Sequence, residues 1–203
     1  MHIKIKKLFL LISLSLAAVP SFCFAGDKKN LSLFTVDPVH SRISFEVTHL
    51  AFSTVEGWFR SFSGTFKFNK ESLEVSDLNA TAEANSIFTD NEKRDNHLKS
   101  TDFLDTKNFP NITFKSTAMK KIDAKNFKLT GDFTMKNVTK KVTFNVKYKG
   151  SQIAFDQEKV AFEGTTKISR KEFGLNFSVL EQAVPLVGDE ITIKVVVQGI
   201  KNK

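Results

Sequence analysis

Most of the chain alternates apolar and polar residues with a period of two, the pattern of β-strands that bury one face. The clearest runs are residues 41–50, 62–68, 127–135 and 160–168, in which bulky apolar side chains occupy every second position. About eight long strands of this kind are expected, nearly all with one apolar and one polar face. Antiparallel strands of this type form a closed barrel or a sandwich, so the sequence predicts an all-β fold.

The alternation stops between residues 89 and 103, where charged and polar side chains crowd together. Thr89 followed three residues later by Glu92 is a capping-box signature, and an acidic Asp90 suits the positive end of a helix dipole. This segment therefore predicts about two turns of helix over residues 90–99. Arg94 and His97 lie in it and form, with their neighbours, the densest group of chemically capable side chains in the chain.

The apolar face of the predicted strands contains two kinds of residue. Phenylalanine fills many of its positions, whereas Ala80, Ala82 and Ala84 occupy one entire strand face, and glycines such as Gly131 take single positions on others. Large rings opposite small residues can mean tight interlocking packing. They can equally mean a cavity with aromatic walls along the alanine strand, and a barrel of about eight strands is just wide enough for one small ligand. The pattern alone leaves both alternatives open.

The first 25 residues have the features of a secretory signal peptide. Three lysines precede an apolar run at residues 8–19, which is short for a membrane span, and Cys23-Phe24-Ala25 forms a small-x-small cleavage site. A lipoprotein signal that acylates Cys23 is the alternative, but it requires small residues before the cysteine, and Phe22 stands there. We expect cleavage after Ala25, a periplasmic or secreted protein, a single domain over residues 26–203, and no integral membrane segment in the mature chain.

The composition of the chain then excludes some classes of function. Cleavage removes the only cysteine, so the mature chain contains neither a disulfide nor a thiolate nucleophile. The formal charge of +8 falls to +5 once the three signal-peptide lysines are lost. The remaining lysines alternate with the aromatic residues on strands instead of clustering with them, so no nucleic-acid groove is predicted.

Several segments resemble the YceI-like family, a group of small, largely bacterial secreted or periplasmic proteins. The resemblance covers nearly all of the predicted mature domain in order, with two departures, Asn137 before Val138 and Glu172 before Phe173. The matching segments include Asp37-Pro38-Val39-His40-Ser41, Gly57-Trp58-Phe59, Arg94-Asp95-Asn96-His97-Leu98, Phe109-Pro110, Leu129-Thr130-Gly131-Asp132-Phe133-Thr134, Val138-Thr139-Lys140, Ile168-Ser169-Arg170-Lys171-Glu172-Phe173-Gly174-Leu175 and Val187-Gly188-Asp189-Glu190-Ile191.

The resemblance implies an extended lipocalin-like antiparallel barrel with a short helical insertion near residues 90–104. It also implies an elongated apolar pocket that holds a long-chain lipid, such as a polyisoprenoid or a fatty-acid derivative. Of the two alternatives for the interior, the resemblance favours the cavity.

The histidines His40, His49 and His97 match no compact metal motif. We expect His40 to stabilise a turn, whereas His49, Arg94, Asp95 and His97 are expected at the mouth of the barrel. There they would pin the helix to the barrel, contact a ligand head group or, as the third alternative, take part in metal binding or catalysis. Trp58 is interpreted as a core plug or, alternatively, as a residue that stacks on the ligand.

The sequence thus predicts an exported, non-enzymatic carrier or buffer of a long apolar ligand, without cofactor or metal ion. The alternatives are a metal-assisted enzyme that uses His49 and His97, and a structural barrel with a filled interior. A homodimer that covers the pocket rims is compatible with the pattern. The residues expected to contact ligand are Phe45, Val47, His49, Trp58, Phe66, Phe68, Ala82, Arg94, His97, Leu98, Phe103, Phe114, Phe133, Phe144 and Phe162.

Overall fold

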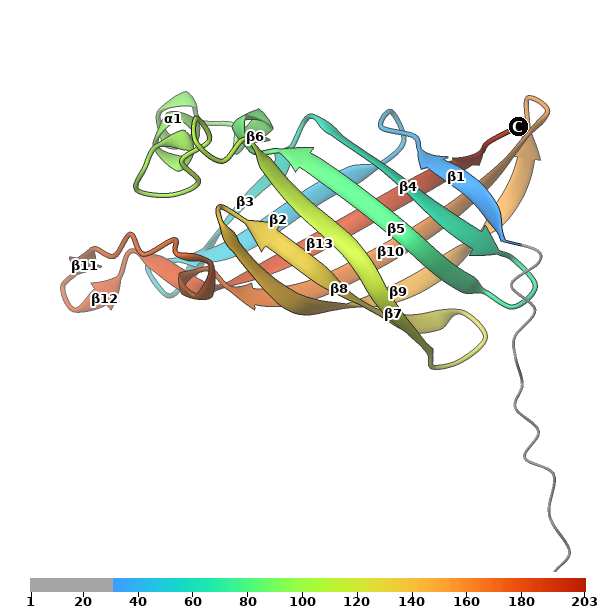
Figure 1. The fold of residues 1–203 in the computed structure, drawn as a ribbon. Helices are drawn as coiled ribbons and strands as arrows, with labels where there is room; N and C mark the ends of the chain where they lie inside the picture. Colours follow the sequence, from blue (N-terminus) through green and yellow to red (C-terminus); the bar gives the residue numbers. More distant parts are fainter. Residues whose placement is uncertain (1–30) are drawn as a thin grey trace, which may run out of the picture.

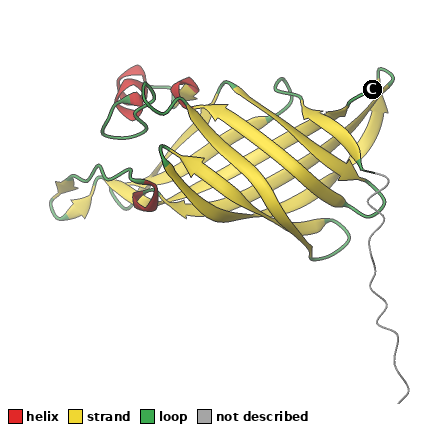
Figure 2. Cartoon of the chain, viewed as in Figure 1, coloured by secondary structure: helices red, strands yellow, loops and turns green. Residues whose placement is uncertain are grey.

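A computed structural model describes residues 31–203, which form an elongated antiparallel β-barrel with one short α-helix (Figure 1). Strands make up nearly all of the regular structure (Figure 2), so the predicted all-β barrel is confirmed. The strands are β1 (Ser32–Val36), β2 (Arg42–His49), β3 (Ser53–Phe59), β4 (Phe62–Asn69), β5 (Glu74–Glu83), β6 (Ile87–Phe88), β7 (Asn111–Lys121), β8 (Asn126–Met135), β9 (Val138–Ala154), β10 (Gln157–Ser169), β11 (Leu180–Glu181), β12 (Val184–Pro185) and β13 (Val187–Lys201). The helix α1 (Glu92–Lys99) and the 3-10 turns η2 (Ala84–Ser86) and η3 (Lys171–Phe173) complete the fold.

The barrel closes through β13. Eight strands follow one another in the order β1, β4, β5, β7, β8, β9, β10 and β13, and β13 pairs back onto β1. This closing contact uses only the last part of β13, where Gly199 faces Val36. The earlier part of β13, from Val187 to Val196, pairs with β2 instead, and β2 continues to β3 and β6. One end of the barrel is therefore closed by β1, and the other is extended by β2, β3 and β6.

The end closed by β1 is filled with aromatic side chains. Phe34, Phe66 and Phe68 are each 2% exposed. The rings of Phe34 and Phe66 are stacked with centroids 5.5 Å apart, and Phe66 meets Phe162 edge to face at 5.7 Å. Further edge and tilted contacts join the other rings. We call this group the aromatic plug; it consists of Phe34, Phe66, Phe68, Phe127, Tyr148 and Phe162.

Interlocking of large and small residues does occur, at glycines. A Cβ atom on Gly131 would lie against the carbonyl oxygen of Lys115 and 2.5 Å from Cζ of Phe114, so the Phe114 ring occupies the space that a side chain would need. Gly57 is covered in the same way by the ring of Phe45, its cross-strand partner. The predicted large-on-small packing is thus real, but it takes place at these glycines and not along the alanine strand.

The helix differs from its prediction at its beginning. It starts at Glu92 with Asn91 as the N-cap, whose side chain accepts a 2.9 Å hydrogen bond from the Arg94 amide. The predicted Thr89 capping box and a start at Asp90 are therefore wrong. Asp90 has a positive φ of 59°, which ends the extended segment, and the Thr89 hydroxyl donates to the buried Asp95 instead of capping. The predicted C-terminal end at Lys99 is correct.

Two shorter predictions concern turns. The two-residue turn Lys136-Asn137 is confirmed, because Met135 pairs with Val138, although the positive φ (55°) falls on Lys136 and not on Asn137. His40 stabilises its turn as expected, through a 2.7 Å contact between its Nδ1 and Oδ2 of Asp37. Burial raises the pKa of Asp37, but hydrogen bonds from His40, the Val39 amide and Gln198 outweigh this effect and hold it below its ordinary value.

The proposed signal peptide, its cleavage site after Ala25 and Cys23 all lie outside residues 31–203, so the structure does not describe them. Within the described range, no helix has the length and apolar character needed to cross a membrane.

The packing at Gly131 leads to a test of how the barrel wall is held. We expect Gly131→Ala to lower the free energy of unfolding by about 2 kcal/mol, because the new methyl group meets backbone that cannot move aside. Gly164→Ala is the matched control, since its Cβ would make one close contact, with the side-chain Cγ2 of Val195 at 2.8 Å, and its next neighbours, Phe144 Cδ1 and Val146 Cγ2, lie at 3.7 Å. Urea unfolding of both variants measures the difference. Equal losses in the two variants would contradict this account.

Candidate functional site: an apolar cavity in the barrel

A cavity of about 240 Å³ lies inside the barrel, beside the aromatic plug. It is bordered by strands from the whole circumference and, at the end away from the plug, by Leu98, Phe103 and Leu104 from α1 and the segment after it. In Figure 1, α1 lies at the end of the barrel opposite to the C-terminus. The cavity therefore extends from the plugged end towards the end that α1 and β2 border.

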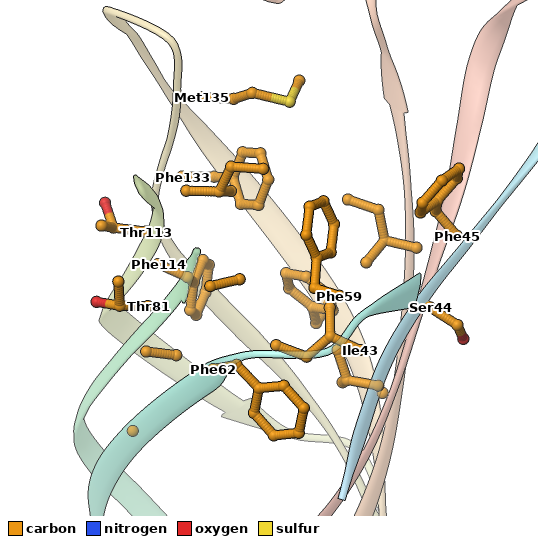
Figure 3. Close-up of a pocket in the computed structure, with 18 of the residues that line it drawn as sticks. Ile43, Ser44, Phe45, Phe59, Phe62, Thr81, Thr113, Phe114, Phe133 and Met135 are labelled. Atoms are coloured by element: carbon orange, nitrogen blue, oxygen red, sulfur yellow. The ribbon is translucent and has the colours of Figure 1, made fainter. Parts of the chain in front are cut away.

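The cavity walls are almost entirely apolar. Figure 3 shows the rings of Phe45, Phe59, Phe62, Phe114 and Phe133 around the cavity. Serine and threonine residues also border the cavity, but they turn their hydroxyl groups away from it. In Figure 3, the hydroxyl groups of Ser44, Thr81 and Thr113 lie at the periphery and point away from the rings. The Ser44 hydroxyl donates instead to the carbonyl oxygen of Lys194.

Space is available because of the alanines of β5. Ala80 and Ala82 border the cavity, and Ala82 lies between its cross-strand partners Phe62 and Ile112. Ala84, the third alanine of this series, is 1% exposed and does not border the cavity. The cavity expected along the alanine strand is thus present, next to the interlocked glycines described above.

Of the fifteen residues predicted to contact ligand, ten border the cavity. Their aromatic and aliphatic side chains come from both the strands and the segment around α1. These ten are Phe45, Val47, Phe66, Ala82, Leu98, Phe103, Phe114, Phe133, Phe144 and Phe162. Contact between these residues and a ligand stays a prediction.

The other five lie away from the cavity. Phe68 belongs to the aromatic plug, in edge contact with Phe162 at 5.2 Å. Trp58 is on the outer face of β3, because its neighbour Gly57 faces Phe45 on the inside, and it packs against Phe88 at 5.0 Å with the Arg42 guanidinium 5.2 Å from its ring.

His49, Arg94 and His97 also lie outside the cavity, and each has its own partners. The His49 carbonyl accepts from the hydroxyl of Ser53, and no hydrogen bond joins His49 to Arg94 or His97, all of which lie in the described part of the chain. His97 contacts Asp102 at 2.9 Å and stacks edge to face on Phe103 at 5.0 Å. Since Phe103 borders the cavity, His97 lies one layer behind its wall.

Arg94 anchors α1 to the strand before it. Its Nε and Nη2 donate to the hydroxyl and the carbonyl oxygen of Thr89 at 2.7 and 2.6 Å. The amide and hydroxyl of Thr89 in turn donate to Oδ1 of Asp95 at 2.8 and 2.5 Å. Asp95 and Thr89 are 7% and 4% exposed, so this is a buried polar network whose members satisfy one another. Of the roles considered for this cluster, the contacts of Arg94 and Asp95 correspond to pinning of the helix.

Sequence reasoning missed several residues of the cavity wall. Ile43, Phe59 and Phe62 border the cavity and share the inward parity of predicted neighbours, so the same pattern could have identified them. The most important omission is Arg170, which among residues 31–203 is the one charged residue that borders the cavity. Arg170 continues the inward-facing series of Phe162, Gly164 and Ile168 on β10. A charged residue at an inward-facing position of a strand could therefore have identified it as a site residue.

A metal site is not apparent in the described part of the chain. Within residues 31–203, no three His, Cys, Asp or Glu side chains are grouped so that they could hold a metal ion.

Comparison with known sequences identifies relatives of this architecture. Residues 34–199 match the family model described as a YceI-like domain. The chain is 33% identical over 165 residues to Protein YceI of Escherichia coli O17:K52:H18 (strain UMN026 / ExPEC), which covers 81% of this chain and 83% of that protein. It is 30% identical, with the same coverage, to a UPF0312 protein of Pseudomonas putida (strain GB-1).

Solved structures give the same result for the fold. A Campylobacter jejuni YCEI protein has a TM-score of 0.69 at 30% sequence identity, over 77% of this chain and 90% of that chain. Burkholderia cenocepacia BcnA has a TM-score of 0.70 at 23% identity, over 80% and 98%. A polyisoprenoid binding domain from Saccharophagus degradans has a TM-score of 0.60 at 11% identity, over 85% and 99%; at this identity the likeness concerns the fold alone.

The buried network around Asp95 yields a prediction for α1. We expect Asp95→Ala to speed the amide hydrogen exchange of residues 92–99, because it leaves the buried N–H and hydroxyl of Thr89 without their acceptor, at a cost of roughly 1–3 kcal/mol. Lys93→Ala, on the exposed face of the same helix, is the control. If both variants exchange alike, the network does not hold the helix.

Proposed function

Because the chain belongs to the YceI-like family, we propose that it is a binding protein that holds one long apolar ligand, a polyisoprenoid or a fatty-acid derivative, in its barrel cavity. The observation that carries this proposal is the cavity itself: about 240 Å³ of space, walled by aromatic and aliphatic side chains and plugged at one end. Ligand pockets of roughly 300–1,000 Å³ serve drug-sized molecules, so this slightly smaller space suits a slender chain better than a bulky ring system.

Energetics support a bound ligand. Unfilled apolar cavities cost roughly 24 cal/mol per Å³, which amounts to roughly 6 kcal/mol for a cavity of this size. A chain that fills the space would recover much of this amount through dispersion contacts and through its own removal from water. It would also raise the apparent stability of the protein by mass action.

The relatives support the same chemistry. The Saccharophagus degradans domain with this fold is described as binding polyisoprenoids. We carry this ligand class to the present chain because its cavity has the required apolar character, and not on the basis of the low sequence identity.

Binding is favoured over catalysis by the way the polar groups are used. Arg94 and Asp95 are engaged with Thr89, and His97 lies behind Phe103, so none of the three borders the cavity. The walls thus offer a ligand apolar contact at nearly every point. We therefore propose a non-enzymatic role in carriage, storage or stress protection.

The place of action follows from the proposed signal peptide. Cleavage after Ala25 would deliver the mature chain, residues 26–203, to the periplasm or the medium. This location stays a prediction, as does a homodimer that covers the rims of the cavity.

Blocking the cavity tests the proposal. We expect Ala82→Trp to weaken binding of a fatty acid such as hexadecanoate by roughly tenfold or more, because the indole takes the space of at least two methylene groups of the ligand. The graded variants Ala80→Leu and Ala82→Leu should give smaller losses. Fluorescent-probe displacement measures affinity, and far-UV circular dichroism checks that each variant is folded.

Ala118→Trp is the matched control, since Ala118 is exposed on the neighbouring strand β7 and does not border the cavity. It should bind hexadecanoate as the unaltered protein does. A folded Ala82→Trp protein that retains full affinity would remove the cavity from this account.

A further inference from the structure

Arg170 is the feature of the cavity that apolar binding leaves unexplained. It borders the cavity and is only 2% exposed. It directly follows β10, whose inward residues Phe162, Gly164 and Ile168 also border the cavity. Burying a cation in apolar surroundings is costly unless it is paired. Contact with pure hydrocarbon would not compensate this charge.

The guanidinium is held firmly by the main chain. Its Nε donates to the carbonyl oxygen of Gly188 at 2.8 Å, its Nη1 to that of Leu175 at 2.5 Å, and its Nη2 to that of Val187 at 3.2 Å. These bonds use three of its five N–H groups and, within residues 31–203, leave one on each Nη atom. The guanidinium group is thus fixed in position and retains two N–H groups that could donate further hydrogen bonds.

The charge of Arg170 is only partly balanced. Among residues 31–203, no carboxylate lies within 4.0 Å of the guanidinium. Burial lowers the pKa of Arg170 below its usual range, and the charge of Asp189 opposes this shift only in part. Asp189 is exposed and is itself engaged, through 2.7 and 3.1 Å hydrogen bonds from the Ser169 hydroxyl and the Lys171 amide.

A second cation is directed to the same segment. Nζ of Lys136 lies 3.5 Å from the carbonyl oxygen of Gly174, the residue before the Leu175 that Arg170 contacts. Leu175 itself borders the cavity. Lys136 itself does not border the cavity, but its contact places a second positive charge next to the segment that holds the guanidinium. A carboxylate or a phosphate is the group that would compensate the charge of Arg170.

We propose that Arg170 receives the oxyanion head group, a carboxylate or a phosphate, of a single-chain lipid whose tail runs along β10 towards the aromatic plug. This inference rests on the proposed function and specifies its ligand. The eight residue-to-residue steps from Phe162 to Arg170 span roughly 26 Å of strand, or roughly 20 Å along the axis of a barrel with the usual strand tilt. The site thus selects chains that are apolar over this length and anionic at one end.

The test compares ligands that share one tail. Delipidated protein is titrated with hexadecanoate, hexadecyl phosphate and hexadecanol in a probe-displacement assay. We expect at least one of the two anions to bind roughly tenfold or more tightly than the alcohol, since hydrogen bonds to a charged group are about twice as strong as neutral ones. The better of the two anions identifies the head group.

Variants of Arg170 show whether this residue recognises the head group or only stabilises the fold. Arg170→Gln should lower the ratio of anion to alcohol affinity to about one, and Arg170→Lys should retain part of the preference. Lys167→Gln is the matched control, because it removes the same charge from the exposed face of β10 and should leave the ratio unchanged. A purely structural role would weaken all three ligands together without changing the ratio.

The outcomes are distinct. Equal affinity of the unaltered protein for the alcohol and both anions would overturn the role of Arg170 while leaving lipid binding intact, and this result needs no variant to fold. An Arg170→Gln protein that keeps the full preference would overturn it as well. Failure of all three ligands to bind the unaltered protein would instead refute the proposed function.

Discussion

The structure depends on the way in which one edge of β13 pairs with two different strands, β1 and β2. Its last residues pair with β1 and close the barrel, whereas its earlier part, Val187 and Ile191–Val196, pairs with β2 and extends the wall beyond the closed part. At the end closed by β1, the interior is filled by the rings of the aromatic plug. Beyond the plug, the small side chains of Ala80 and Ala82 on β5 leave space inside the barrel. A cavity closed at one end is the consequence of this arrangement.

Polar groups are distributed so that they leave the cavity apolar. The hydrogen-bonding side chains around α1 satisfy one another or the backbone, and surface lysines pair with carboxylates on the outer faces, as Lys141 does with Asp132 at 2.8 Å. Arg170 is the exception, since it is buried beside the cavity and no carboxylate of the described residues lies close to it. In an interior of low dielectric constant such a charge interacts more strongly with its surroundings than it would in water.

Much of this architecture could be predicted from the sequence, because a period of two assigns each strand residue to a face. Parity correctly placed Phe45, Phe114 and Phe133 inside, and the same parity places Arg170 there. The start of α1 could not be predicted in this way, since Asn91 and Thr89 are both good caps, and the hydrogen bond of the Thr89 hydroxyl to Asp95 leaves Asn91 as the cap. Parity likewise cannot separate the plug from the cavity wall, because Phe68 and Phe66 have the same pattern and differ only in their depth in the barrel.

The central claim is that the cavity holds a long apolar chain, and the most direct test is native mass spectrometry of the mature protein purified from its natural host. Solvent extraction and mass analysis of the released material complete the measurement. The account predicts a discrete adduct of lipid mass that extracts into organic solvent and leaves protein that can take up the same compound again. A protein that carries no adduct, and that takes up neither an isoprenoid nor a fatty-acid derivative when these are added, would contradict it.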